Sequence, residues 1–189
     1  MVTELKNIYQ LKVTLQGLQP PIWRRILVDD SVSLDKFHII LQIVMGWTNS
    51  HLHQFVANGK LYGMMETDAF FDDEMEDEKK FRLRDILKKE KDSLIYEYDF
   101  GDSWIHEVML EKIMPYDPDV AVPMCIEAER ACPPEDVGGV WGYFDFLEAM
   151  KDPSHPSHES YKEWVDGSFD PSEYEMDVVN KLLREYCSS

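Results

Sequence analysis

The sequence is poor in basic residues. It has 19 Lys and Arg against 37 Asp and Glu, which gives a formal net charge of −18 at pH 7. Binding to nucleic acid requires a basic face that meets the phosphates, and anionic membrane surfaces attract basic segments for the same reason. The composition therefore argues against nucleic acids and lipid surfaces as partners. A protein partner with a basic face, or a cation, is compatible with it.

Cysteine and long apolar runs are also scarce. The chain has three cysteines, an odd number, and no C-x-x-C motif. No stretch approaches the roughly 18 consecutive apolar residues of a membrane-spanning helix, and the residues after Met1 lack the apolar core of a secretory signal. We therefore expect a cytoplasmic protein with reduced thiols and no membrane span.

Hydrophobic residues make up 44% of the 189 residues, enough for a substantial core. Their periodicity predicts strands over 8–16, 22–28, 51–56 and 60–62, a β-hairpin over 96–111, and helices over 34–45, 143–151, 157–166 and from 170 onward. We predict an α+β fold: a mainly antiparallel sheet of about five to six strands, one long helix from the N-terminal half packed on it, and a C-terminal group of three helices. We treat 1–189 as a single domain, strand-rich over 1–115 and made of loops and helices over 116–189.

The predicted hairpin, 96–111, has the sequence YEYDFGDSWIHEVMLE and turns near Gly101. A connection of two or four residues places Glu97 opposite His106 across the two strands. A connection of three residues shifts the register and places Tyr98 opposite His106 instead. The length of the turn therefore decides the surroundings of this histidine.

In the first register, one carboxylate lies opposite His106 and another lies on the diagonal. Such neighbours stabilise the imidazolium form, so we expect the pKa of His106 to lie above about 6.5. The cluster then serves either acid–base chemistry or a structural ion pair. The candidate catalytic residues are His106, Asp99, Glu97 and Asp136.

Two further histidines, His51 and His53, are two positions apart in a predicted strand and therefore share one face. Such a pair binds a metal ion when a third ligand comes from elsewhere in the fold. A polar sheet face is the alternative interpretation. A divalent metal is the cofactor that this pattern allows, and its candidate ligands are His51, His53, His106 and Asp102.

The segment 131–139, ACPPEDVGG, combines two prolines that fix φ with two glycines that free it. It predicts a rigid surface loop that presents Glu135 and Asp136. The segment has no lysine, serine or threonine, so it is not a phosphate-binding loop. We expect a raised pKa for Cys132, which counts against a nucleophile there. The candidate binding surface consists of Trp104, Glu135, Asp136 and Trp141.

The acidic run over 66–78 lacks the central glycine and the regular ligand spacing of an EF-hand. It predicts a solvated loop.

Several segments together carry a resemblance to a known family. They include YQLKVTL at 9–15, PIWRR at 21–25, HLHQF at 51–55, YDFGDSWIH at 98–106 and ACPPEDVGG at 131–139, followed by Gly142-Tyr143 and by Phe169-Asp170-Pro171. In this order they resemble the plasmid pRiA4b ORF-three-like family, some members of which carry the label TnpR. The resemblance extends over nearly the whole chain. It implies an α+β fold and no established activity.

The TnpR label would suggest a resolvase. A serine recombinase needs a nucleophilic serine beside an arginine cluster and a basic DNA-binding tail, and this acidic chain has neither.

Two functional hypotheses follow from the sequence. The first is a cytosolic, non-catalytic binding or regulatory module with an acidic surface. The alternative is a metal-dependent hydrolase that uses His51, His53, Asp99 and His106. The hypotheses differ in geometry, because a metal or catalytic site requires these side chains to converge in a cleft.

Overall fold

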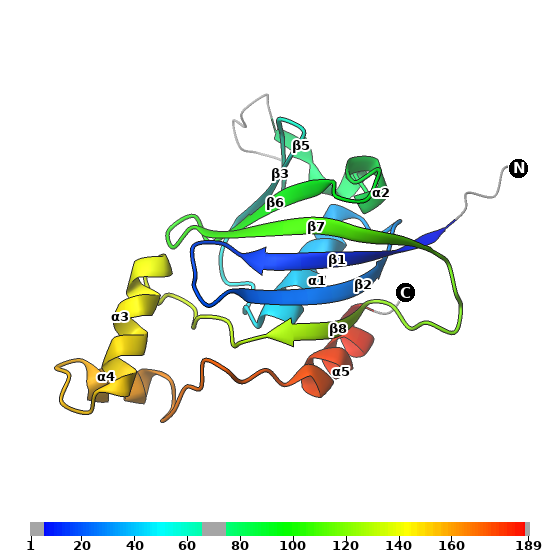
Figure 1. Ribbon diagram of the computed structural model, residues 1–189. Helices are drawn as coiled ribbons and strands as arrows, with labels where there is room; N and C mark the ends of the chain where they lie inside the picture. Colours follow the sequence, from blue (N-terminus) through cyan, green and yellow to red (C-terminus); the bar gives the residue numbers. More distant parts are fainter. Residues whose placement is uncertain (1–5, 66–74, 188–189) are drawn as a thin grey trace, which may run out of the picture.

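The computed structural model describes residues 6–65 and 75–187 and consists of one mixed sheet with helices on one face and at one end (Figure 1). The strands are β1 (Asn7–Leu15), β2 (Ile22–Asp29), β3 (His53–Ala57), β4 (Lys60–Gly63), β5 (Met75–Asp77), β6 (Ser93–Tyr98), β7 (Trp104–Pro115) and β8 (Met124–Glu129). The helices are α1 (Leu34–Met45), α2 (Leu83–Ile86), α3 (Gly139–Lys151), α4 (His158–Trp164) and α5 (Met176–Cys187), with a 3-10 turn at Glu78–Lys80.

The strands form one eight-stranded sheet in the order β5-β4-β3-β6-β7-β1-β2-β8. Neighbouring strands are antiparallel except β4 and β5, which are parallel. The α+β class is confirmed, but the predicted number of strands is too low. Strand β5 has no apolar alternation, so its sequence gives no strand signal. Within the two described ranges, none of the helices has the length and apolar content needed to cross a bilayer.

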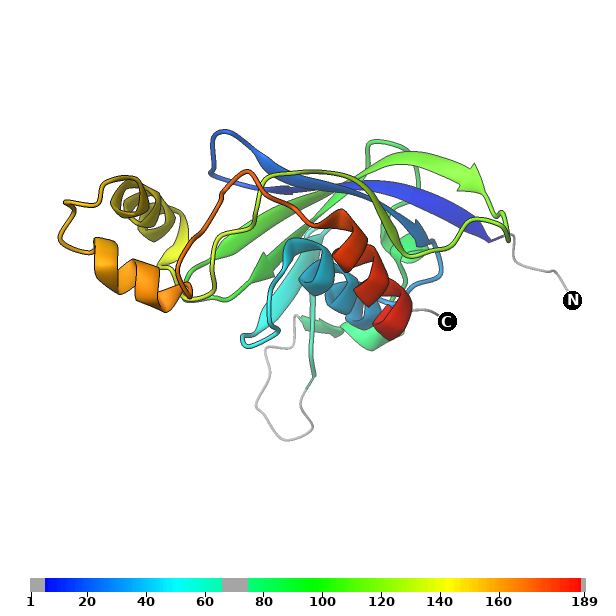
Figure 2. The ribbon, with the colours of Figure 1, turned by 90° about the horizontal axis from the view of Figure 1, so that it is seen from below.

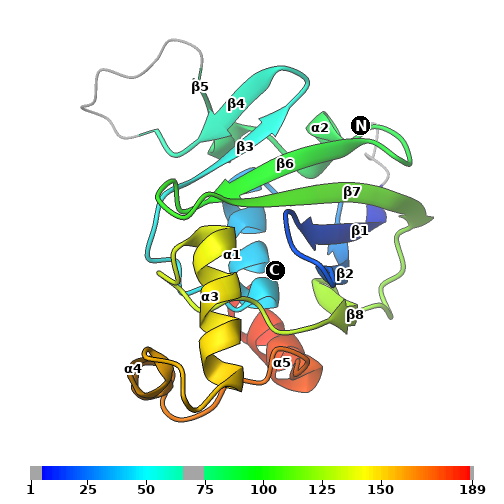
Figure 3. The same ribbon diagram turned by 60° about the vertical axis from the view of Figure 1, so that its left-hand side comes forward.

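Helix α1 packs on one face of the sheet, and α5 lies beside α1 on that face (Figure 2). Helix α1 has the predicted bounds because its apolar residues recur at helical spacing, and Phe37, Leu41 and Val44 are all fully buried. Gly46 ends it with φ of 96°, a left-handed conformation that glycine adopts without steric cost. Helices α3 and α4 stand at the end of the sheet where β6 turns into β7 (Figure 3).

The predicted start of the last helix at Asp170 is wrong, because α5 begins at Met176. The Asp170 carboxylate accepts hydrogen bonds from the backbone and the hydroxyl of Ser172, which close a local turn. Two tertiary bonds hold the following chain extended. The Ala131 amide donates to the Pro171 carbonyl over 3.0 Å, and the Tyr174 hydroxyl donates to a carbonyl of α1.

The predicted solvated loop over 66–78 is wrong at its C-terminal end. Residues 75–77 form β5, and Glu78 is buried. The rest of the run, 66–74, lies outside the described residues.

The register of the β6–β7 hairpin differs from both predicted registers. Tyr96 pairs with His106, and Tyr98 pairs with Trp104. The connection has five residues, 99–103, and the Ser103 amide closes it by donating to the Asp99 carbonyl over 2.6 Å. Asp99 and Ser103 both have positive φ, 57° and 53°. Aspartate adopts this conformation more often than most residues, but serine does not. Glu97 therefore does not face His106.

His106 is a core residue rather than a member of an acidic cluster. It is fully buried, its Nδ1 lies 3.2 Å from the Tyr96 carbonyl, and its Nε2 accepts from the Trp47 indole over 3.4 Å. Burial lowers its pKa to about 4. The expectation of a raised pKa is wrong, because desolvation acts here in place of the predicted carboxylates.

Two buried neutral histidines make stability depend on pH. Burial lowers the pKa of His38, as of His106, to about 4, whereas an unfolded histidine titrates near 6.5. The unfolded state therefore takes up protons first, and stability is lost as the pH falls from about 6.5 to about 4. We expect each histidine to remove about 2 kcal/mol from the free energy of unfolding at about pH 5.

Urea unfolding at about pH 7 and about pH 5 measures this loss. In the His106→Gln variant, the loss of unfolding free energy between the two pH values should be smaller by the contribution of His106. The His155→Gln variant, altered at a partly exposed position, should show the same loss as the unaltered protein. Equal pH dependence in His106→Gln and in the unaltered protein would contradict the assignment.

Candidate functional site

Three separate segments converge at the end of the sheet where β6 turns into β7. His51 lies just before β3, Asp99 follows β6, and Asp136 lies in the loop that precedes α3. Ligand-capable atoms of these three residues all lie within 4.8 Å of one another. The sequence places them far apart, so only the fold brings them together.

The Nε2 atom of His51 is the centre of this cluster. It lies 3.0 Å from an oxygen of Asp136, 3.7 Å from Oδ2 of Asp99 and 3.8 Å from Oε2 of Glu135. Among the described residues, neither His51 Nε2 nor Glu135 Oε2, both buried atoms, has a hydrogen-bond partner. The ligand atoms of His51, Asp99 and Asp136 thus lie close together, and Glu135 Oε2 borders the same imidazole nitrogen. We call these four residues the His51 cluster.

Hydrogen bonds orient Glu135 toward the cluster. Its Oε1 accepts from the backbone amide of Thr48 over 2.7 Å, from the Thr48 hydroxyl over 3.1 Å and from the Tyr98 hydroxyl over 3.0 Å. Burial raises the pKa of Tyr98 to about 12, so its hydroxyl stays a donor at neutral pH. Because one oxygen is occupied by these donors, the other is left to face His51.

The hairpin turn orients Asp99 in the same way. Its Oδ1 accepts from the Gly101 amide over 2.9 Å, and its own amide donates to the Leu52 carbonyl over 2.9 Å. The side chain is about nine-tenths buried, with 10% exposed, and Oδ2 is the oxygen directed at His51.

Asp102, a predicted metal ligand, holds the loop in place. Its carboxylate accepts from the Gly138 amide over 3.0 Å. Gly139 has φ of +68° and approaches the hairpin so closely that a Cβ there would lie 2.7 Å from the Asp102 carbonyl oxygen. A side chain at this position would prevent the close approach, so glycine is required by contact as well as by conformation.

His53 does not share a site with His51, because β3 begins only at His53 and turns its side chain into the core. Its Nε2 lies 2.9 Å from the buried Glu78 carboxylate, and its ring stacks on His38 at 3.5 Å. The predicted pairing of His51 with His53 on one strand face is therefore wrong.

The remaining predicted residues lie outside the cluster. Glu97 is on the other face of the sheet, where it accepts from Gln54 over 2.7 Å and from Ser103 over 2.9 Å. Trp104 is fully buried, so its assignment to an exposed binding surface is wrong. Trp141, by contrast, is 82% exposed at the start of α3.

Sequence reasoning missed Thr48 and Tyr98, which position Glu135. Tyr98 follows the alternation of β6 into the core, and a buried tyrosine needs a hydrogen-bond partner. That requirement was the available signal, but it does not identify the partner.

Cys132 lies at the base of the same loop. Burial raises the pKa of its thiol, as the sequence predicts.

Comparison with known proteins gives a consistent result. The family model described as "Plasmid pRiA4b ORF-3-like protein" matches residues 7–178. The chain belongs to the plasmid pRiA4b ORF-3-like family. It is 36% identical over 178 residues to "Uncharacterized protein y4hQ" of Sinorhizobium fredii (strain NBRC 101917 / NGR234), covering 94% of this chain and 91% of the relative.

A solved structure of similar sequence also shares the fold. The crystal structure of a protein of unknown function, MM3350 from Methanosarcina mazei Go1, superposes with a TM-score of 0.81 at 37% identity. The match covers 92% of this chain and 98% of the other. The pRiA4b ORF-3-like family thus accounts for the fold, and the descriptions of these relatives name no activity.

In this family member, the close approach at Gly139 can be tested directly. We expect Gly139→Ala to lower the free energy of unfolding by about 1–3 kcal/mol, because the new Cβ strains φ and meets the Asp102 carbonyl. Hydrogen exchange of the amides over 131–138 should speed up as the loop detaches.

Gly59→Ala is a matched control, because Gly59 has φ of +76° but no atom lies within 4 Å of the position that a Cβ would take. It should show the conformational cost without the collision. Equal losses in the two variants would mean that the approach to Asp102 contributes nothing.

Proposed function

We propose that the protein is a non-catalytic binding module whose site takes one divalent transition-metal ion in the His51 cluster. The observation that carries the proposal is the approach of three carboxylates to one imidazole nitrogen. Within residues 6–65 and 75–187, His51 Nε2 and Glu135 Oε2 are left without hydrogen bonds. Buried polar atoms without partners cost free energy, and a cation would remove that cost at both atoms.

The spacing of the cluster fits a small ion. Ligand atoms about 2.0–2.1 Å from a tetrahedral zinc lie about 3.3 Å from one another. The three oxygens lie 3.0, 3.7 and 3.8 Å from His51 Nε2, on both sides of that value. The ligand types favour zinc, manganese or iron over calcium, because calcium prefers six to eight oxygen ligands and rarely takes imidazole.

The residues around the cluster favour binding over hydrolysis. The hydrolase hypothesis needs His53 and His106, and each of these is buried in the core with its own partners. His51, Asp99 and Asp136 would be the ligands, so an ion would occupy each of these groups and none of the three would be available as a general base. An ion here would join the hairpin turn, the segment before β3 and the loop over 131–138.

Metal titration tests the proposal. We expect about one zinc or manganese ion per chain, with His51→Ala weakening the affinity by at least about a hundredfold because it removes the only nitrogen ligand. Saturation at about a hundred times the dissociation constant should raise the free energy of unfolding by about 2.7 kcal/mol.

Two controls accompany it. His155→Ala removes a partly exposed histidine between α3 and α4, and Asp119→Asn removes an exposed carboxylate between β7 and β8. Both should bind as the unaltered protein does. Metal binding that survives in His51→Ala, or the absence of binding by zinc, manganese and iron, would refute the site.

A further inference from the structure

Arg24 of β2 is a buried cation without a carboxylate partner. Its side chain is fully buried, and within residues 6–65 and 75–187 it forms no ion pair. Nε donates to the Val44 carbonyl over 2.7 Å, and Nη1 donates to the carbonyls of Trp23 and Glu129 over 2.9 and 3.0 Å. The Tyr174 ring covers the guanidinium at 4.0 Å. Nη2 has no hydrogen-bond partner in the described part of the chain.

This arrangement leaves part of the charge uncompensated. Backbone carbonyls and an aromatic face stabilise a guanidinium, but they do not replace an anion in a buried position. Nε and both N–H groups of Nη1 are already bonded to carbonyls, so within the described residues the two N–H groups of Nη2 are the donors left for an anion. The free Nη2 is therefore a donor that lacks an acceptor of this kind.

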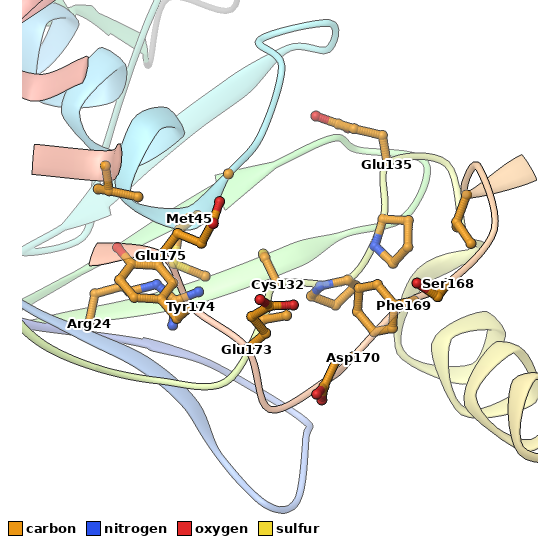
Figure 4. Close-up of a pocket in the computed structure, with 16 residues that line it drawn as sticks. Arg24, Met45, Cys132, Glu135, Ser168, Phe169, Asp170, Glu173, Tyr174 and Glu175 are labelled. Carbon is orange, nitrogen blue, oxygen red and sulfur yellow. The ribbon is translucent and has the colours of Figure 1, made fainter. Parts of the chain in front are cut away.

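Arg24 lines a pocket of about 640 Å³ between α1, the loop over 131–135 and the connection from α4 to α5. This volume lies within the range of about 300–1,000 Å³ that is usual for small-molecule sites. Figure 4 shows Arg24 and Tyr174 at one end of the pocket and Phe169 with Asp170 at the other, with Glu173 between them. The wall is apolar at Met45, Pro133, Pro134 and Val179. Four carboxylates line it: Glu135, Asp170, Glu173 and Glu175.

We propose that this pocket binds a small zwitterion of the basic amino-acid type. Its carboxylate would lie on Arg24 Nη2, and one of its ammonium groups beside Glu173. The pairing uses the buried cation and the acidic lining at the same time. A multiply charged anion such as phosphate would meet repulsion from Glu173 and Glu175 and from a chain of net charge −18. A simple diamine would leave Arg24 unpaired.

Entry to Arg24 requires a movement of the pocket wall, because less than 1 Å² of Nη2 is accessible. Tyr174 forms this wall, and it lies between α4 and α5 in a segment without helix or strand. A ligand carboxylate that displaces the ring would replace a cation–π contact with a charged hydrogen bond.

Three probes built on the same five-carbon chain separate the two contacts. L-lysine carries both charges, cadaverine lacks the carboxylate, and hexanoate lacks the amines. Calorimetric titration of the full chain, with a chelator present so that metal coordination contributes nothing, should show binding of L-lysine tighter than that of either fragment. Absence of lysine binding at millimolar concentration, equal binding of cadaverine, or tighter binding of inorganic phosphate would overturn the proposal.

Variants add a second measurement. Glu173→Gln, at an exposed position, should weaken the affinity for lysine by about fivefold, since it removes one partly solvated ion pair. The affinity for hexanoate should not change. Glu185→Gln, exposed on α5 outside the pocket lining, is the matched control and should leave both unchanged. If Glu173→Gln and Glu185→Gln bind lysine equally, the ammonium contact is wrong. Arg24→Lys keeps the charge but lacks Nη2, and it should weaken the binding of lysine and of hexanoate together.

Discussion

The turn from β6 to β7 determines much of this structure. The Asp99 carboxylate accepts from the Gly101 amide, and the Ser103 amide donates to the Asp99 carbonyl, so five residues close the hairpin. This closure fixes the register, and a slip of one residue would exchange the two faces of a strand. In the observed register, Tyr96, Tyr98, Trp104 and His106 are all buried, while Asp99 remains at the rim of the sheet.

Much of the fold follows from periodicity. The helix over 34–45 has its predicted bounds, and the hairpin at Asn58-Gly59 is present, because apolar spacing and turn residues specify both. The register around Gly101 does not follow, because it depends on positive φ at both Asp99 and Ser103, and serine has no local preference for that conformation. Strand β5 could not be predicted from the sequence either, because its pairing with β4 depends on tertiary structure.

The candidate site was predictable in part. The sequence identified the loop with Glu135 and Asp136, the histidine His51 and the hairpin carboxylate Asp99, because each is a chemically distinctive residue beside a turn signal. It did not separate His51 from His53. His51 precedes β3, whereas His53 is its first residue and shares the buried face of the strand with Phe55 and Ala57. There it stacks on a helix histidine and contacts Glu78. Arg24 was recognisable only after its partners were known to be carbonyls.

Trp47 gives the molecule a built-in optical probe. Its ring centroid lies 5.5 Å from those of both Trp104 and Tyr98, at fixed angles of 31° and 37°. The next residue, Thr48, holds Glu135 through its amide and hydroxyl. Rigid aromatic packing of this kind produces near-ultraviolet circular dichroism, which is lost when tertiary packing loosens. The native chromophores therefore report the state of the adjoining loop without any attached label.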